Sequence, residues 1–149
     1  ALLLDGLDDA LTTDVAVNPK DGPFSVFAWV QGGAPGQVLF SQQAGVNWLM
    51  LDAVTGVLMT ELRGAGRVSN TLSSATVIAD GNWHRVGLAY DGANRTLYVD
   101  DLPVAQDSQA GLAGSSGALY IGCGRDKAAG SFWSGLLDDV RIYNRAVQP

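Results

Sequence analysis

Apolar and polar residues alternate along most of this 149-residue chain, and a period of two is the pattern of β-strands. The segment from Phe24 to Gln31 is apolar at nearly every position, which indicates a strand buried on both faces inside a sandwich. Apolar segments at 37–41, 47–51 and 57–62 follow it, and the turn-forming residues 52–56 separate the last two. The spacing therefore predicts consecutive antiparallel strands, each about five to eight residues long.

The clearest strand pattern lies in the second half of the chain. Residues 83–90 end on Asp91-Gly92, a dipeptide that favours a tight turn because glycine tolerates a positive φ angle. The further strands expected after this turn are residues 95–99, 104–106, 118–122 and 132–143. No segment carries a persuasive apolar stripe at helical spacing. The pattern predicts an all-β chain, folded as a single domain over residues 1–149, in which two antiparallel sheets pack face to face.

Composition supports this fold class and argues against some functions. Glycine occurs 19 times and lysine only at Lys20 and Lys127, which favours strands and tight turns over helices. The net charge of −6 argues against nucleic acid and anionic membranes as partners. No apolar run approaches the roughly 20 residues of a membrane-spanning helix. The single cysteine, Cys123, excludes an internal disulfide, and we expect it to be a buried, inert thiol.

Five segments, in order and spread over nearly the whole chain, resemble the motifs of laminin G-like jelly-roll domains. They are Leu4–Asp9, Phe24–Val30, Asp80–Val86, Tyr98–Asp101 and Leu137–Ala146. The resemblance implies a concanavalin A-like jelly-roll sandwich of two curved sheets. That superfamily includes lectins, carbohydrate-binding modules, adhesion domains and glycosidases, so the fold alone does not choose a function. The chain departs from the family pattern at Asp101, where glycine is usual, and at Arg85, where a second histidine is usual.

The distribution of carboxylates predicts that the chain is not an enzyme. Glycosidases place two carboxyl groups about 5–9.5 Å apart across one cleft. Glu61 is the only glutamate, and no predicted strand carries acidic residues at positions i and i+2. The pairs at 100–101 and 138–139 are adjacent, so in a strand their side chains point to opposite faces. A site assembled from dispersed carboxylates, such as Glu61 and Asp138, stays open as an alternative. His84, the only histidine, is expected to be a packed or capping residue.

The resemblance also implies a structural calcium ion that ties the first strand to the last. Its implied ligands are the carboxylates of Asp5 and Asp138 and the backbone carbonyls of Gly6 and Gly22. Calcium takes six to eight oxygen ligands, often from segments far apart in sequence. The alternative is that Asp138 and its neighbour Asp139 cap hairpin ends or pair with the arginines that follow them.

A sugar site typically combines an aromatic ring with planar hydrogen-bonding side chains. Trp29 and Trp83 lie in the family's framework motifs, so we expect them in the core, whereas Trp48 and Trp133 lie beside loops and are the better stacking candidates. The predicted ligand-binding residues are Asn47, Trp48, Arg63, Arg67, Asn70, Arg125 and Trp133. Asp126 lies next to Arg125 in a late loop that is expected to form the rim.

The leading hypothesis is a non-catalytic, lectin-like module that binds a polysaccharide or glycan. It predicts at least one exposed aromatic side chain in a polar groove. The second hypothesis is a protein–protein adhesion or spacer domain, which predicts a flat contact surface or an exposed sheet edge. A glycoside hydrolase with a dispersed carboxylate site is the third. Because the chain opens on Ala1 without an initiator methionine, we expect a domain excised from a longer protein that is secreted or on the cell surface.

Overall fold

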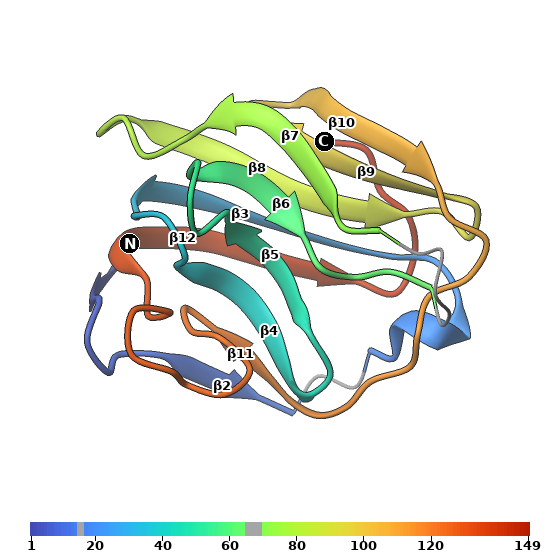
Figure 1. Cartoon of the computed structure of the whole chain (residues 1–149), viewed down its shortest axis with the longest axis horizontal. Coiled ribbons are helices and arrows are strands. Elements are labelled where there is room, and N and C mark those ends of the chain that lie inside the picture. The colour runs from blue at the N-terminus through green and yellow to red at the C-terminus, as the bar shows by residue number, and fades with distance from the viewer. Residues whose placement is uncertain (15–16, 65–69) are drawn as a thin grey trace.

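The computed structural model describes residues 1–14, 17–64 and 70–149, and it confirms the predicted all-β class. Two six-stranded antiparallel sheets form a sandwich (Figure 1). The strands are β1 (Leu2–Asp5), β2 (Leu11–Thr13), β3 (Phe24–Gly32), β4 (Val38–Ala44), β5 (Asn47–Leu51), β6 (Val57–Thr60), β7 (Leu72–Val77), β8 (Trp83–Tyr90), β9 (Asn94–Val99), β10 (Leu102–Ser108), β11 (Ser116–Ile121) and β12 (Ser134–Tyr143). The one helical turn in these ranges is the 3₁₀ helix η1 (Pro19–Asp21), and no described helix is long and apolar enough to cross a membrane.

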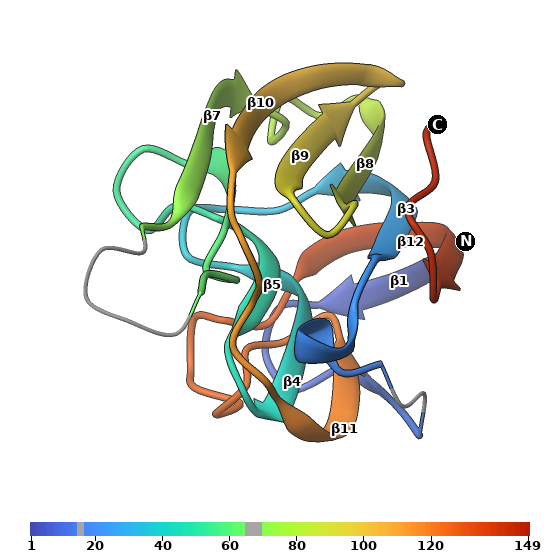
Figure 2. The same ribbon diagram turned by 90° about the vertical axis from the view of Figure 1, so that its right-hand side faces the viewer.

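The strand order places distant segments of the chain side by side. The first sheet has the order β1-β12-β3-β8-β9-β10, and the second has β2-β11-β4-β5-β6-β7. The last strand, β12, therefore lies between β1 and β3 and brings the two ends of the chain into one sheet. The sheets approach each other where β7 lies beside β10 (Figure 2).

The core lies between the sheets, and β3 shows how the sequence builds it. Alternate residues of this strand, Phe24, Val26, Ala28 and Val30, point inward and are at most 1% exposed. Phe27 points to the outer face, yet it is also buried because Tyr98 and the C-terminal segment pack against it. The strand is therefore apolar on both faces, as the sequence predicts. Cys123 is fully buried as expected, and burial raises the pKa of its thiol.

Arg95 is a buried cation at one end of the sandwich. It lies on β9 and is 1% exposed. Its Nη1 donates to the carbonyl oxygens of Leu62, at 2.6 Å, and Asn70, at 2.8 Å. Its Nε donates to Asp107 Oδ1 at 2.8 Å, and its Nη2 pairs with Asp107 Oδ2. Because charge-assisted hydrogen bonds are the strong ones, this side chain fixes the two backbone positions that bracket residues 63–69.

Candidate ligand-binding site

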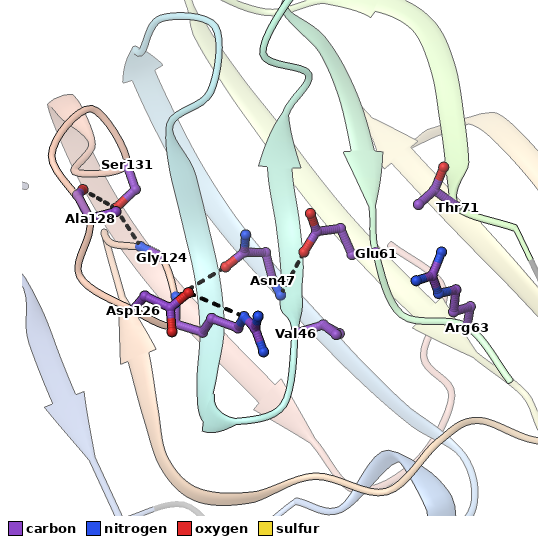
Figure 3. A pocket seen from close by; sticks show the side chains of 10 residues that line it. Val46, Asn47, Glu61, Arg63, Thr71, Gly124, Asp126, Ala128 and Ser131 are labelled. Carbon is purple, nitrogen blue, oxygen red and sulfur yellow. Dashed lines mark hydrogen bonds and ion pairs between the residues drawn. The ribbon is translucent and has the colours of Figure 1, made fainter. Parts of the chain in front are cut away.

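A polar hollow of about 550 Å³ lies on the outer face of the second sheet (Figure 3). It forms where β5 begins and the segment after β6 leaves the sheet, and the loop between β11 and β12 closes one side. The residues that line it are Val46, Asn47, Glu61, Arg63, Thr71, Gly124, Arg125, Asp126, Ala128 and Ser131. The lining thus combines an amide, two carboxylates, two guanidinium groups and two hydroxyls. Groups of this kind hydrogen-bond the hydroxyls of a polar ligand.

Asn47 organises the floor of the hollow. Its backbone N–H donates to Glu61 Oε2 at 3.1 Å, and its carbonyl oxygen accepts from the backbone N–H of Glu61 at 3.2 Å. Its side-chain Oδ1 accepts from the backbone N–H of Arg125 at 3.1 Å. Asn47 therefore holds together Glu61 and Arg125, which lie 14 and 78 positions away from it in the sequence.

The loop between β11 and β12 forms one wall through its own hydrogen bonds. Ser131 Oγ donates to the carbonyl oxygen of Ala128 at 2.7 Å and accepts from the backbone N–H of Gly124 at 3.1 Å. Arg125 Nη1 donates to the carbonyl oxygen of Gly45 at 2.8 Å, and its Nε lies 3.5 Å from Asp126 Oδ2. The wall is therefore held in place without help from a ligand.

Arg63 and Thr71 form the opposite wall, and both are exposed. The carbonyl oxygen of Arg63 accepts from the backbone N–H of Ala113 at 2.9 Å, which anchors this segment to the loop after β10. A second hollow of about 100 Å³ shares Val46, Glu61 and Arg63 with the first and extends toward Ser115. The side chain of Arg63 thus lies between two adjoining hollows.

Three of the predicted ligand-binding residues come together here: Asn47, Arg63 and Arg125. The predicted rim residue Asp126 joins them. Asn70 is exposed and is not part of the lining, and its described role is to offer its carbonyl oxygen to Arg95. Arg67 lies outside the described residues.

Six of the lining residues were not predicted as ligand contacts, and Glu61 and Thr71 are among them. Glu61 was weighed only as a lone carboxylate, and Thr71 was not considered. Glu61 reaches the hollow because the segment after β6 stays hydrogen-bonded to Asn47 beyond the end of the strand. No local sequence signal predicts that contact.

The prediction for the four tryptophans is wrong. Trp48 and Trp133 are fully buried, so neither can stack beneath a sugar, whereas Trp29 and Trp83 are each 37% exposed on the outer face of the first sheet. Trp48 points into the core, and the Trp133 ring packs where a Cβ on Gly33 would otherwise stand, with 2.4 Å between them. Within the described ranges, the indole N–H groups of Trp48 and Trp133 have no hydrogen-bond partner, so apolar packing decides their position.

The predicted calcium ligands are not gathered, because the strand register separates them. Asp138 lies beside the chain terminus, with Oδ2 3.3 Å from the Ala1 amino group. Asp5 lies at the other end of β1, four residues along from Ala1, which corresponds to about 13 Å at the rise of a strand, and Gly6 follows it. Gly22 precedes β3, whose first residues pair with the far end of β12. One ion cannot bind these four residues together.

The alternative role for the acidic pair on β12 is confirmed for one of its members. Asp139 Oδ1 lies 2.9 Å from Arg141 Nε, which is an ion pair within the strand. The backbone N–H of Asp139 and then the Ala1 amino group keep the pKa of Asp138 below its ordinary value.

A different group of carboxylates lies in the turn after β1. One oxygen each from Asp5, Asp8 and Asp9 fall within 4.8 Å of one another, and all three residues are exposed. The backbone N–H of Leu7, at 2.8 Å from Asp5 Oδ1, keeps the pKa of Asp5 below its ordinary value. Carboxylate oxygens are the ligands that calcium prefers, so this group could bind a metal ion. Calcium binding stays a prediction.

The hollow contains two carboxylates, a feature that the sequence did not predict. Glu61 accepts from Asn47, and Asp126 is 72% exposed beside Arg125. Catalytic acids of glycosidases are enclosed so that they stay protonated, and Asp126 lacks such an enclosure. His84 is far from this hollow in the topology, on β8 of the first sheet, where its ring lies between Asp80 and Asp100.

Comparison with solved structures shows the same fold in proteins of low sequence identity. A SAP-like heptameric pentraxin from Limulus polyphemus matches 97% of this chain and 76% of its own, with 16% identity and a TM-score of 0.60. Domains LG4-5 of the mouse laminin α1 chain match 94% of this chain and 40% of theirs, with 13% identity and a TM-score of 0.69. A proposed carbohydrate-binding protein from Bacteroides ovatus matches 97% of this chain and 44% of its own, with 15% identity and a TM-score of 0.72.

The chain thus spans less than half the length of two of these structures. No curated protein sequence matches it. The profile of a laminin G family, described as the concanavalin A-like lectin/glucanases superfamily, matches residues 5–149. That span contains all five motifs noted in the sequence apart from Leu4. The chain is therefore a laminin G-like domain and belongs to the concanavalin A-like lectin/glucanase superfamily.

Proposed function

We propose that this domain is a non-catalytic carbohydrate-binding module and that the hollow on the second sheet is its binding site. The observation that carries the proposal is the convergence of Asn47, Glu61, Arg63 and Arg125 around one open space of about 550 Å³. A pyranose presents hydroxyls around a ring, and planar amide, carboxylate and guanidinium groups are suited to hydrogen-bond them. The superfamily and the fold of the Bacteroides ovatus protein support the same ligand class.

The hollow differs in one respect from the site expected for a lectin. No aromatic residue is among the described residues that line it. Recognition in the hollow would therefore rest on hydrogen bonds, with little stacking. The exposed Trp29 and Trp83 lie on the other sheet and do not complete this site.

The same two tryptophans favour protein adhesion as a second candidate function. In the first sheet, Leu3 pairs with Leu136, which pairs with Gln31, which pairs with Trp83, so these side chains form one row across three strand boundaries. Leu3 is 68% exposed, and Trp29 lies on the same face. Exposed aromatic side chains grouped on one face are typical of contact surfaces between proteins. Either function is consistent with the extracellular location that we propose for the domain.

A glycan array run with three proteins separates these functions. Wild type, Glu61→Ala in the hollow and Trp83→Ala on the first sheet are compared in calcium and in chelator, after circular dichroism has shown that each is folded. We expect wild type and Trp83→Ala to bind the same glycans and Glu61→Ala to lose most of the signal.

Loss of signal in Trp83→Ala with binding retained in Glu61→Ala would place the ligand on the first sheet and overturn the assignment of the hollow. Silence of folded wild type under both conditions would reject carbohydrate binding and favour adhesion. Hydrolysis of a bound glycan by wild type would reject the non-catalytic assignment.

A further inference from the structure

The charged groups of the hollow are unequally partnered. Glu61 accepts a hydrogen bond from Asn47 at 3.1 Å, and Arg125 contacts both Asp126 and the carbonyl oxygen of Gly45. The guanidinium of Arg63 has no hydrogen bond, ion pair or ring contact within residues 1–14, 17–64 and 70–149.

The other arginines of the described ranges each have an acidic or aromatic partner. Arg85, Arg95, Arg125 and Arg141 each pair with an aspartate. Arg145 lies over the ring of Tyr143 at 5.9 Å. The chain has 15 acidic residues for 9 basic ones, so carboxylates are in excess. An arginine that remains unpaired in such a chain, inside a hollow, leaves its charge available to a ligand.

The position of Arg63 gives an anion access to that charge. Figure 3 shows its side chain on the same wall as Thr71, across the hollow from Asp126 and Ala128. The residue also borders the smaller hollow that extends toward Ser115, so Arg63 lines both spaces. A ligand longer than one sugar ring could contact Arg63 from either space.

We propose, on the basis of the function proposed above, that this site selects saccharides that carry a carboxylate, with Arg63 as the partner of that group. The planar guanidinium presents two parallel N–H groups at the spacing of the two oxygens of a carboxylate. The net charge of −6 opposes the approach of long polyanions, so short uronic acid oligomers suit the site better than densely charged chains. An exposed charge-assisted contact of this kind is expected to change affinity about tenfold.

The test compares trigalacturonic acid with its fully methyl-esterified form, which has the same length but no charge. Calorimetric titrations are run on wild type, Arg63→Gln, Arg63→Lys and Arg141→Gln at low and high salt. Arg141→Gln is the matched control, because it removes the same charge from an exposed arginine of the first sheet.

We expect wild type to bind the acid about tenfold more tightly than the ester, with the difference reduced at high salt. Arg63→Gln should bind both forms equally, Arg63→Lys should keep part of the preference, and Arg141→Gln should keep all of it.

Equal affinity of wild type for the acid and the ester would overturn the inference while leaving carbohydrate binding intact. An equal loss of preference in Arg63→Gln and Arg141→Gln would also overturn it, because the effect would then come from net charge. If folded wild type binds neither form and no glycan of the array, the proposed function itself has failed and this inference fails with it. Circular dichroism of each variant excludes misfolding as the cause.

Discussion

Arg95 and Asp107 form a bidentate ion pair in which the arginine is buried and the aspartate is partly exposed. The Arg95 side chain is 2% exposed, and the Asp107 side chain is 36% exposed. The pair joins neighbouring strands β9 and β10, and the remaining donor of Arg95 holds the carbonyl oxygens of Leu62 and Asn70. The ion pair therefore stabilises both a strand pair of the first sheet and the segment that carries Arg63 into the hollow.

Asp107→Asn should destabilise the domain by about 3 kcal/mol, because it leaves a buried guanidinium without its counter-charge. Urea denaturation followed by circular dichroism measures this loss. The substitution should also weaken ligand binding in the hollow. Arg95 would be held less firmly without the charge of Asp107, and Arg95 is the donor to the carbonyl oxygens of Leu62 and Asn70.

The matched control is Asp101→Asn, which breaks the exposed ion pair between Arg85 and Asp101. Exposed pairs contribute about 0.2–1 kcal/mol, so this variant should unfold close to wild type. If Asp107→Asn and Asp101→Asn lower the free energy of unfolding equally, the buried pair contributes no more to stability than the exposed one.

His84 should make the stability of the domain fall at alkaline pH. Its Nδ1 lies 2.8 Å from Asp100 Oδ2 and its Nε2 lies 3.0 Å from Asp80 Oδ1. Burial opposes protonation, but the hydrogen bonds to Asp100 and Asp80 outweigh it and raise the pKa of His84 above its ordinary value of 6.5. A raised pKa stabilises the folded state below about pH 6.5, and this contribution is lost as the pH rises through the folded-state value.

Urea midpoints measured from pH 5.5 to 9 test this expectation, and His84→Gln should remove the alkaline decline. Asp80 has the opposite effect on the pH dependence of stability, because its pKa is lowered in the folded state and not raised. The backbone N–H of Asn82 and then His84 lower the pKa of Asp80 to about 2. Its contribution is therefore present above its ordinary value of 3.8 and is lost as the pH falls toward 2. A midpoint that does not change between pH 6 and 9 would contradict the role of His84.

Tryptophan fluorescence should report two classes of side chain. Acrylamide should quench Trp29 and Trp83, which are exposed, and should leave Trp48 and Trp133 largely unquenched because they are buried. The double variant Trp29→Phe/Trp83→Phe should lose most of the quenchable emission. Trp48→Phe is the control and should raise the quenchable fraction, and the opposite result would contradict the placement of the four rings.

Asp138→Asn should leave any effect of calcium on the melting temperature unchanged, because Asp138 lies at the opposite end of β1 from the Asp5 turn. Asp8→Asn should reduce that effect if the ion binds at Asp5, Asp8 and Asp9. Thermal melts in calcium and in chelator measure both variants. A melt of metal-free wild type that does not respond to calcium would contradict the sequence-based expectation of a structural ion.

The alternation of apolar residues predicts the strands that build the core, and it predicts the edge strands less well. The segments at 24–31 and 83–90 are strands as expected, because burial on both faces leaves long apolar runs. The strands β1, β2 and β7 were not predicted from this alternation. All three lie at sheet edges, β2 has three residues, and β7 is rich in serine and threonine. Edge strands need fewer buried residues, so their sequences carry a weaker pattern.

The candidate site was partly predictable for the same kind of reason. Asn47 and Arg125 were found because they lie beside turns, where polar side chains at loops indicate binding. Glu61 was missed because its place depends on a hydrogen bond across the sheet to Asn47. The tryptophans were misplaced because β3 is apolar on both faces, so its pattern does not say which face is covered. Phe27 is covered by Tyr98 and the C-terminal segment, whereas Trp29 is not.

The hydrogen bonds of Arg95 to Leu62 and Asn70 are accepted by main-chain carbonyl oxygens. Every amino acid has such an oxygen, so this anchor makes no demand on the side chains of the residues between them. The anchor at Leu62 and Asn70 therefore depends on Arg95 and Asp107 and not on the side chains of the residues between the two carbonyl groups. Randomising that segment while keeping Arg95 and Asp107 offers a direct route to new ligand specificities on an unchanged scaffold.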